Sequence, residues 1–129
     1  MLNNSAVTAN IPASDLGRAQ AFYADKLGLE PVQESPGGVV YTTAGGTTFF
    51  LYETTYAGQA GHTIAQFHVS DVAREVEDLK SRGVTFEHYD MPNTSWDGDV
   101  ASLEGMGKAA WFTDSEGNIL CLDSGFPDS

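Results

Sequence analysis

Residues 62–69 carry polar side chains with the alternation typical of a strand. Thr, Ala, Phe and Val occupy positions 63, 65, 67 and 69, while His62, Ile64, Gln66 and His68 share the opposite face. Imidazole changes its charge near neutral pH, so His62 and His68 could hydrogen-bond a ligand or carry protons. The alternative interpretation leaves one histidine in water and pairs the other with a carboxylate. Because six residues of a strand span about 20 Å, the two histidines cannot share one metal ion.

Aromatic residues form a second group with potential for binding. Phe50 and Tyr52 share one face of an expected strand over residues 47–53, where they either line a cavity that accepts a flat guest by stacking or fill the core. Trp96 lies in a polar stretch between Ser95 and Asp97. A large ring is costly to leave in water, so we expect Trp96 to close over a ligand or a partner subunit. The alternation leaves the orientation of Trp111 open.

Cys121 and Asp123 share one face of an expected strand over residues 119–123. A single cysteine cannot form an internal disulfide, and such a residue is more often a small buried side chain than a nucleophile. Asp123 could meet a cationic group or be solvated at the strand end. Thr8 and Asn10, on an expected strand over residues 7–13, are the polar side chains we expect at the floor of a cavity.

Two amphipathic helices must position these strands. The first helix begins at Ser14 or Asp15 and ends at Gly28, and the second begins after Ser70 and ends at Gly83. One strand precedes each helix, over residues 7–13 and 62–69. Further strands follow each helix, over residues 39–42 and 47–53 in the first half and residues 84–89, 109–113 and 119–123 in the second.

The two halves therefore repeat, and a duplication of this kind predicts two equivalent βαβββ modules about a pseudo-twofold axis. We expect a single domain over residues 1–129, with modules at about residues 5–55 and 60–126. The second module is longer. Its extra residues fit in the Gly-rich polar stretch 90–108, which is long enough to act as a lid or rim.

Three motifs carry a resemblance to a known family. They are Ile11-Pro12-Ala13-Ser14-Asp15-Leu16, the pair Phe22-Tyr23 followed by Leu27-Gly28-Leu29, and the hairpin Asp114-Ser115-Glu116-Gly117-Asn118. With these motifs the chain resembles the vicinal oxygen chelate superfamily of glyoxalase I, bleomycin-resistance proteins and extradiol dioxygenases. The resemblance implies an α+β fold in which two βαβββ modules form an open curled barrel around a ligand cavity. It also implies a homodimer.

Metal enzymes of this superfamily hold a divalent ion with residues on the first and last strand of each module. By the resemblance those four positions fall on Thr8, Phe50, Ile64 and Cys121. Only Cys121 is a credible ligand, and the oxygen and nitrogen donors that a catalytic Zn, Ni or Fe needs are missing. We therefore expect a metal-free member with no cofactor.

The charge balance narrows the choice of partner. The net charge of −12 disfavours nucleic acid and anionic membrane surfaces, and the absence of a leader-like or spanning segment predicts a cytoplasmic protein. We expect the cavity to bind a small organic molecule, aromatic and cationic, without converting it. Two alternatives remain: a lyase, isomerase or dioxygenase that uses an unconventional metal site or acid–base catalysis by histidine, and a partner-binding subunit whose cavity is filled by its own side chains.

Overall fold

Aspartate side chains start both helices in the computed structural model, which describes residues 1–105 and 107–125. Helix α1 (Leu16–Asp25) follows Asp15, whose carboxylate accepts a hydrogen bond from the backbone N–H of Arg18 at 3.0 Å. Helix α2 (Val72–Ser81) follows Asp71, which accepts one from Arg74 N at 3.1 Å. Each carboxylate satisfies an amide that has no partner within the helix, so both starts agree with the prediction.

The first sheet has the strand order β1-β4-β3-β2. Its strands are β1 (Ala9–Ala13), β2 (Gln33–Ser35), β3 (Gly38–Thr42) and β4 (Thr48–Glu53), and two short 3-10 helices lie at Leu2–Asn4 and Ala44–Gly46. Strand β1 runs parallel to β4 and pairs Asn10 with Phe50. The short strand β2 was not expected from the sequence.

The second sheet repeats this plan and extends it. Its order is β5-β10-β9-β8-β7, with β6 also paired to β9. The strands are β5 (Thr63–His68), β6 (Phe86–Glu87), β7 (Thr94–Asp97), β8 (Val100–Leu103), β9 (Gly107–Thr113) and β10 (Ile119–Asp123). Strand β5 runs parallel to β10 as β1 does to β4, and it pairs Gln66 with Cys121. The repeat seen in the sequence is therefore present in the topology.

The polar stretch 90–108, which the sequence suggested as a lid or rim, is built largely from strands. Most of it is the β7–β8 hairpin, which adds two strands to the second sheet. Val100 and Ala101 are buried in it. Backbone hydrogen bonds between β7 and β8, and between β8 and β9, pair the amide groups of this segment. A polar segment can therefore form part of the sheet.

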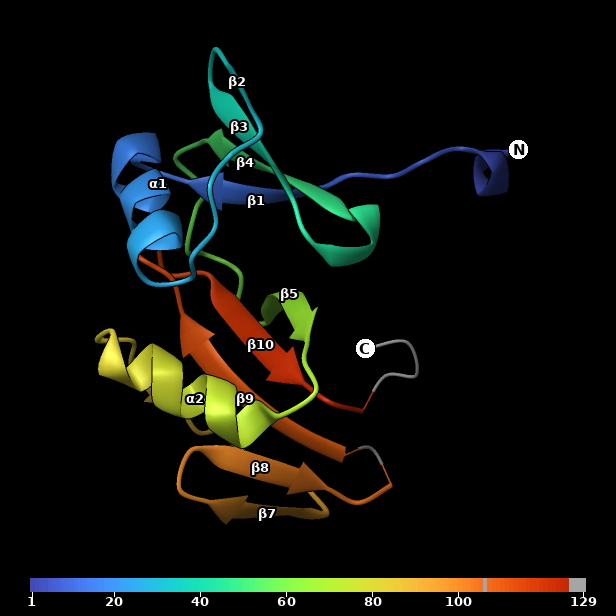
Figure 1. Cartoon of the computed structure of the whole chain (residues 1–129), viewed down its shortest axis with the longest axis vertical. Coiled ribbons are helices and arrows are strands. Elements are labelled where there is room, and N and C mark those ends of the chain that lie inside the picture. The colour runs from blue at the N-terminus through green and yellow to red at the C-terminus, as the bar shows by residue number, and fades with distance from the viewer. Residues whose placement is uncertain (106, 126–129) are drawn as a thin grey trace.

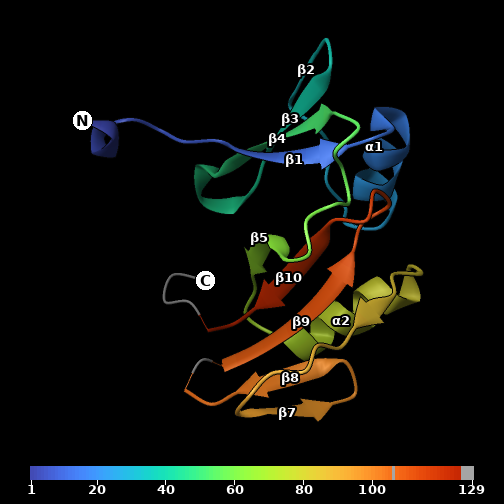
Figure 2. The ribbon, with the colours of Figure 1, turned by 180° about the vertical axis from the view of Figure 1, so that it is seen from behind.

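Each sheet is packed on one face and open on the other. The packed faces supply Ile11, Tyr41 and Leu51 in the first sheet and Phe112 and Leu120 in the second, and all of these are almost fully buried. Both helices lie on the same side of the molecule, opposite the N-terminal segment (Figures 1 and 2). The fold is the expected α+β arrangement, with curled open sheets.

The β9–β10 turn of the second sheet binds the start of α1. Asn118 Nδ2 donates to the carbonyl of Pro12 at 2.8 Å, and Glu116 Oε1 accepts from the backbone N–H groups of Ser14 and Asp15 at 3.0 and 2.9 Å. Buried polar groups with several partners fix one relative placement of the two halves. Among the described residues, no helix is long and apolar enough to span a membrane.

Candidate functional site

The open face of the first sheet carries two aromatic rings. Phe50 and Tyr52 of β4 stack with their ring centroids 6.3 Å apart and their planes 8° from parallel. Phe50 covers Gly38 of β3 so closely that a Cβ on this glycine would lie 2.2 Å from Phe50 Cζ. Both rings are only partly buried. The predicted ring-lined face is therefore formed by β4, and it depends on the missing side chain at position 38.

Thr8 and Asn10 lie beside these rings but make different contacts. Asn10 is exposed and is the register partner of Phe50. Thr8 precedes β1, is exposed, and shares a hydrogen bond of 3.2 Å with the hydroxyl of Thr48. Both side chains border the open face, at the edge of the first sheet rather than beneath a closed cavity.

A polar cluster occupies the corresponding part of the second sheet. Asp123 is 5% exposed, and its Oδ2 accepts a hydrogen bond from Gln66 Nε2 at 3.1 Å and bonds His68 Nδ1 at 3.0 Å. Its Oδ1 accepts from the backbone N–H of Gly125 at 3.3 Å. The structure thus brings together three of the predicted site residues. A buried carboxylate that holds an imidazole through Nδ1 fixes the orientation of its ring.

Cys121 lies next to this cluster and has a thiol of low reactivity. Its side chain is buried, and burial together with the nearby Asp123 charge raises the pKa of the thiol to about 12. Its Sγ donates to the carbonyl of Leu122 at 3.3 Å. Since the thiolate is the reactive form, the raised pKa makes this side chain a poor nucleophile near neutral pH.

An aromatic pocket of about 240 Å³ opens farther along the same face. Its lining residues are Gly61, His62, Thr63, Tyr89, Met91, Trp111 and Ile119. Trp111 pairs with Cys121 across β9 and β10, which places it on the open face and settles the orientation that the sequence left open. Its Nε1 donates to Thr63 Oγ1 at 3.2 Å, and Tyr89 meets the Trp111 ring edge-on at 5.9 Å between centroids.

Trp96 extends this aromatic wall from β7. Its centroid lies 6.1 Å from that of Trp111, and it stacks on His88 at 4.2 Å with planes 8° from parallel. His88 Nε2 in turn bonds Asp99 Oδ1 at 2.8 Å. Trp96 was expected on a polar loop. It is instead held in a strand between two other rings, so it forms a fixed wall.

Two predicted residues on β5 sit at the margin of this arrangement. Ile64 lies where the β5–β10 register shifts, and it packs against the core cluster. His62 is exposed at the edge of the pocket, with its Nδ1 3.0 Å from the carbonyl of Thr63. Sequence analysis missed Tyr89 and Met91. They follow the two-residue strand β6, where no alternation exists to reveal their direction.

Comparison of the sequence with models of known protein families identifies the family of this chain. The model of the Glyoxalase/Bleomycin resistance protein/Dioxygenase superfamily matches residues 5–122. The chain belongs to this superfamily. The resemblance drawn from the motifs is confirmed, while no curated protein sequence matches the chain.

Solved structures of the superfamily share its fold. The bleomycin resistance determinant encoded on transposon Tn5 is 20% identical with a TM-score of 0.70, covering 96% of this chain and 100% of that one. A bleomycin-binding protein complexed with bleomycin is 21% identical with a TM-score of 0.69, covering 95% and 100%. The fosfomycin resistance protein FosX from Listeria monocytogenes is 18% identical with a TM-score of 0.70, covering 97% and 94%.

The residues at the superfamily's metal positions do not fit a divalent ion in this member. Phe50 and Ile64 have no donor atoms, Thr8 hydrogen-bonds another threonine, and the buried thiol of Cys121 would be the single remaining strong ligand. Within residues 1–105 and 107–125, no three His, Cys, Asp or Glu side chains gather as a metal site. A catalytic metal needs at least three such ligands, so these residues do not support a metal-dependent step.

Proposed function

We propose that this member of the superfamily binds a small organic molecule, with a flat aromatic part and a positive charge, and that it does so without a metal ion. The observation that carries the proposal is the pocket walled by Trp111 and Tyr89, with Trp96 beside it. Aromatic rings fixed on strands bind flat guests by stacking and attract cations through the negative face of the ring.

The charge of the chain supports a cationic guest. A net charge of −12 raises the local concentration of cations at the surface. Asp123 lies four residues along β10 from Ile119 of the pocket, which is about 13 Å on a strand. An elongated ligand that stacks on Trp111 therefore extends toward this carboxylate and the side chains of Gln66 and His68 that bond it.

We further propose that two copies of the chain enclose the ligand as a homodimer. A pocket of about 240 Å³ is smaller than the roughly 300–1,000 Å³ of most ligand sites, so a second wall is needed. The half-buried rings of Phe50 and Tyr52 on the open face of the first sheet are suited to supply it from a second copy. Leu2 and Val7 of the N-terminal segment add exposed apolar surface, at 85% and 88% exposure.

Tryptophan fluorescence titration tests the binding proposal. Aromatic ligands with cationic, neutral and anionic groups are compared, and we expect saturable quenching that is strongest for the cations. Tyr89→Leu should weaken binding about tenfold, because a stacking partner contributes about 1–2 kcal/mol. Tyr56→Leu is the matched control, since Tyr56 is 74% exposed and lies outside the pocket. A panel with no quenching would favour a cavity filled by the protein's own side chains.

Acid–base catalysis by His68 is the second candidate function. The bond between its Nδ1 and the buried Asp123 is the arrangement that orients a general base. The ligands that quench fluorescence are incubated with the protein and analysed by mass spectrometry. Recovery of unchanged ligand supports a binding protein, whereas a product that disappears with His68→Gln while binding persists establishes an enzyme.

A further inference from the structure

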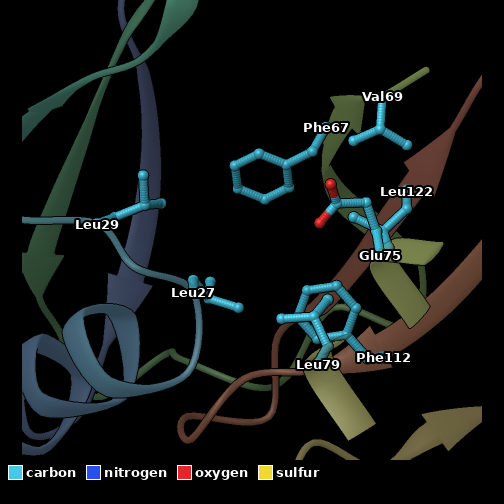
Figure 3. A pocket seen from close by; sticks show the side chains of 8 residues that line it. All are labelled: Leu27, Leu29, Phe67, Val69, Glu75, Leu79, Phe112 and Leu122. Carbon is cyan, nitrogen blue, oxygen red and sulfur yellow. The ribbon is translucent and has the colours of Figure 1, made fainter. Parts of the chain in front are cut away.

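A second cavity, of about 150 Å³, lies on the helix side of the molecule (Figure 3). Leu27 and Leu29, from the segment after α1, face Phe67 of β5 and Phe112 of β9 across it. Leu79 of α2 closes one end. Seven of the eight lining side chains are apolar, so the cavity offers a hydrophobic guest many apolar contacts.

This cavity is separate from the aromatic pocket proposed above. Phe112 lines the cavity and its neighbour Trp111 lines the pocket. Consecutive residues of a strand point to opposite faces, so the second sheet separates the two sites. Binding at the second cavity therefore does not depend on the proposed function of the aromatic pocket.

Glu75 is the one ionisable residue that lines the cavity. It lies in the first turn of α2 and is partly buried, and Figure 3 shows its carboxylate turned toward the Phe67 ring. Among the described residues, this carboxylate has no hydrogen-bond or ion-pair partner. Apolar neighbours displace part of the water around such a carboxylate, and no donor from the described part of the chain replaces it. A cationic ligand that donates hydrogen bonds to the carboxylate would therefore be stabilised there.

We propose that this cavity binds a small hydrophobic ammonium ion, with its apolar end among the leucine and phenylalanine side chains and its charged end on Glu75. The ammonium group supplies up to three N–H donors for the carboxylate oxygens. A cavity of about 150 Å³ has room for a ring the size of benzene. The strongly acidic chain attracts such cations before contact.

Methyl-resolved NMR with 2-phenylethylammonium as the probe tests the site directly. We expect saturable shifts of the methyl groups of Leu27, Leu29, Val69, Leu79 and Leu122, with the indole N–H signals of Trp96 and Trp111 unmoved. The neutral isostere 2-phenylethanol should bind about tenfold more weakly, because it keeps the ring but lacks the charge.

Two glutamate variants test whether Glu75 binds the positive charge of the ammonium probe. Glu75→Gln keeps the shape of the side chain, and it should abolish the preference for the ammonium probe over the alcohol. Glu77→Gln removes the same charge from an exposed position of α2 and should leave the preference unchanged. Thermal unfolding of both variants verifies that they are folded.

Three results would overturn the inference. The first is the absence of methyl shifts at millimolar probe, and the second is equal affinity of Glu75→Gln and the unaltered chain. The third is a response confined to the Trp96 and Trp111 signals, which would support the proposed aromatic pocket while removing the second site. Saturable shifts at the leucine methyl groups, together with no tryptophan quenching in the titration of the aromatic pocket, would support the second site and remove the proposed function.

Discussion

Arg18 of the first half and Glu116 of the second form an ion pair across 98 residues of sequence, with Arg18 Nε 2.8 Å from Glu116 Oε2. Arg18 Nη2 also donates to Glu116 Oε1 at 2.9 Å. The Glu116 side chain is fully buried, whereas that of Arg18 is 53% exposed. A buried carboxylate with two bonds from a guanidinium fixes both the distance and the angle between α1 and the β9–β10 turn.

Replacing Glu116 should therefore be costly. Glu116→Gln keeps the size of the side chain but directs an amide N–H₂ group toward the donors of Arg18, Ser14 or Asp15. We expect the free energy of unfolding to fall by about 3 kcal/mol, as when one partner of a buried pair is removed. Urea denaturation measures it. Lys80→Gln, which breaks the exposed Lys80–Asp99 pair, is the control and should cost under about 1 kcal/mol. Equal effects would contradict the role given to Glu116.

The same carboxylate predicts how stability depends on pH. The hydrogen bonds from Arg18 lower the pKa of Glu116 from 4.5 to about 2 in the folded chain. This depressed pKa stabilises the fold above pH 4.5, by on the order of 3 kcal/mol, and the contribution is lost as the pH falls from 4.5 to about 2. Denaturation midpoints measured across that window should fall more steeply for the unaltered chain than for Glu116→Gln. Parallel curves would show that other carboxylates account for the acid sensitivity.

Loss of the hydroxyl should affect the free energy of unfolding differently at two buried tyrosines. Tyr23 Oη donates to Asp114 Oδ2 at 2.7 Å, and burial beside that carboxylate raises the pKa of the phenol well above its ordinary value. The Tyr41 hydroxyl is the one buried side-chain N or O atom of the described residues without a hydrogen-bond partner. Tyr23→Phe should cost about 1–2 kcal/mol, while Tyr41→Phe should be neutral or stabilising. Thermal unfolding of the two variants tests this, and a larger loss for Tyr41→Phe would refute it.

Local patterns predicted both helices and most of the strands of the fold. The helix starts at Asp15 and Asp71 follow from capping. The repeat predicted two equivalent modules, and the structure adds that β1 pairs with β4, and β5 with β10, in parallel. The β7–β8 hairpin was missed although Gly98-Asp99 between Trp96 and Val100 is a recognised hairpin signal. Its polar composition suggested a loop, and strand pairing overrode that tendency.

Side-chain contacts between residues far apart in sequence could not be predicted from local patterns. The sequence placed Gln66, His68 and Asp123 on open faces, but it could not show that one carboxylate binds both other side chains, because the two strands are joined only in the folded sheet. Glu116 was part of the recognised hairpin, yet nothing nearby in sequence indicates Arg18 as its partner. Ile64 was assigned to the open face because alternation has no means to anticipate the register shift in β5.

The contact between Gly38 and Phe50 gives the sharpest test of the open face in the first sheet. Gly38→Ala would place a Cβ 2.2 Å from Phe50 Cζ, so the ring must leave its stacked position beside Tyr52. We expect a loss of about 1–3 kcal/mol in unfolding free energy, as in overpacked cores. Gly61→Ala is the control, because a Cβ at Gly61 meets no atom within 4 Å. In a Phe50→Ala background the cost of Gly38→Ala should largely vanish, since the clashing ring is absent. Additive costs of the two changes would show that the ring does not rest on Gly38.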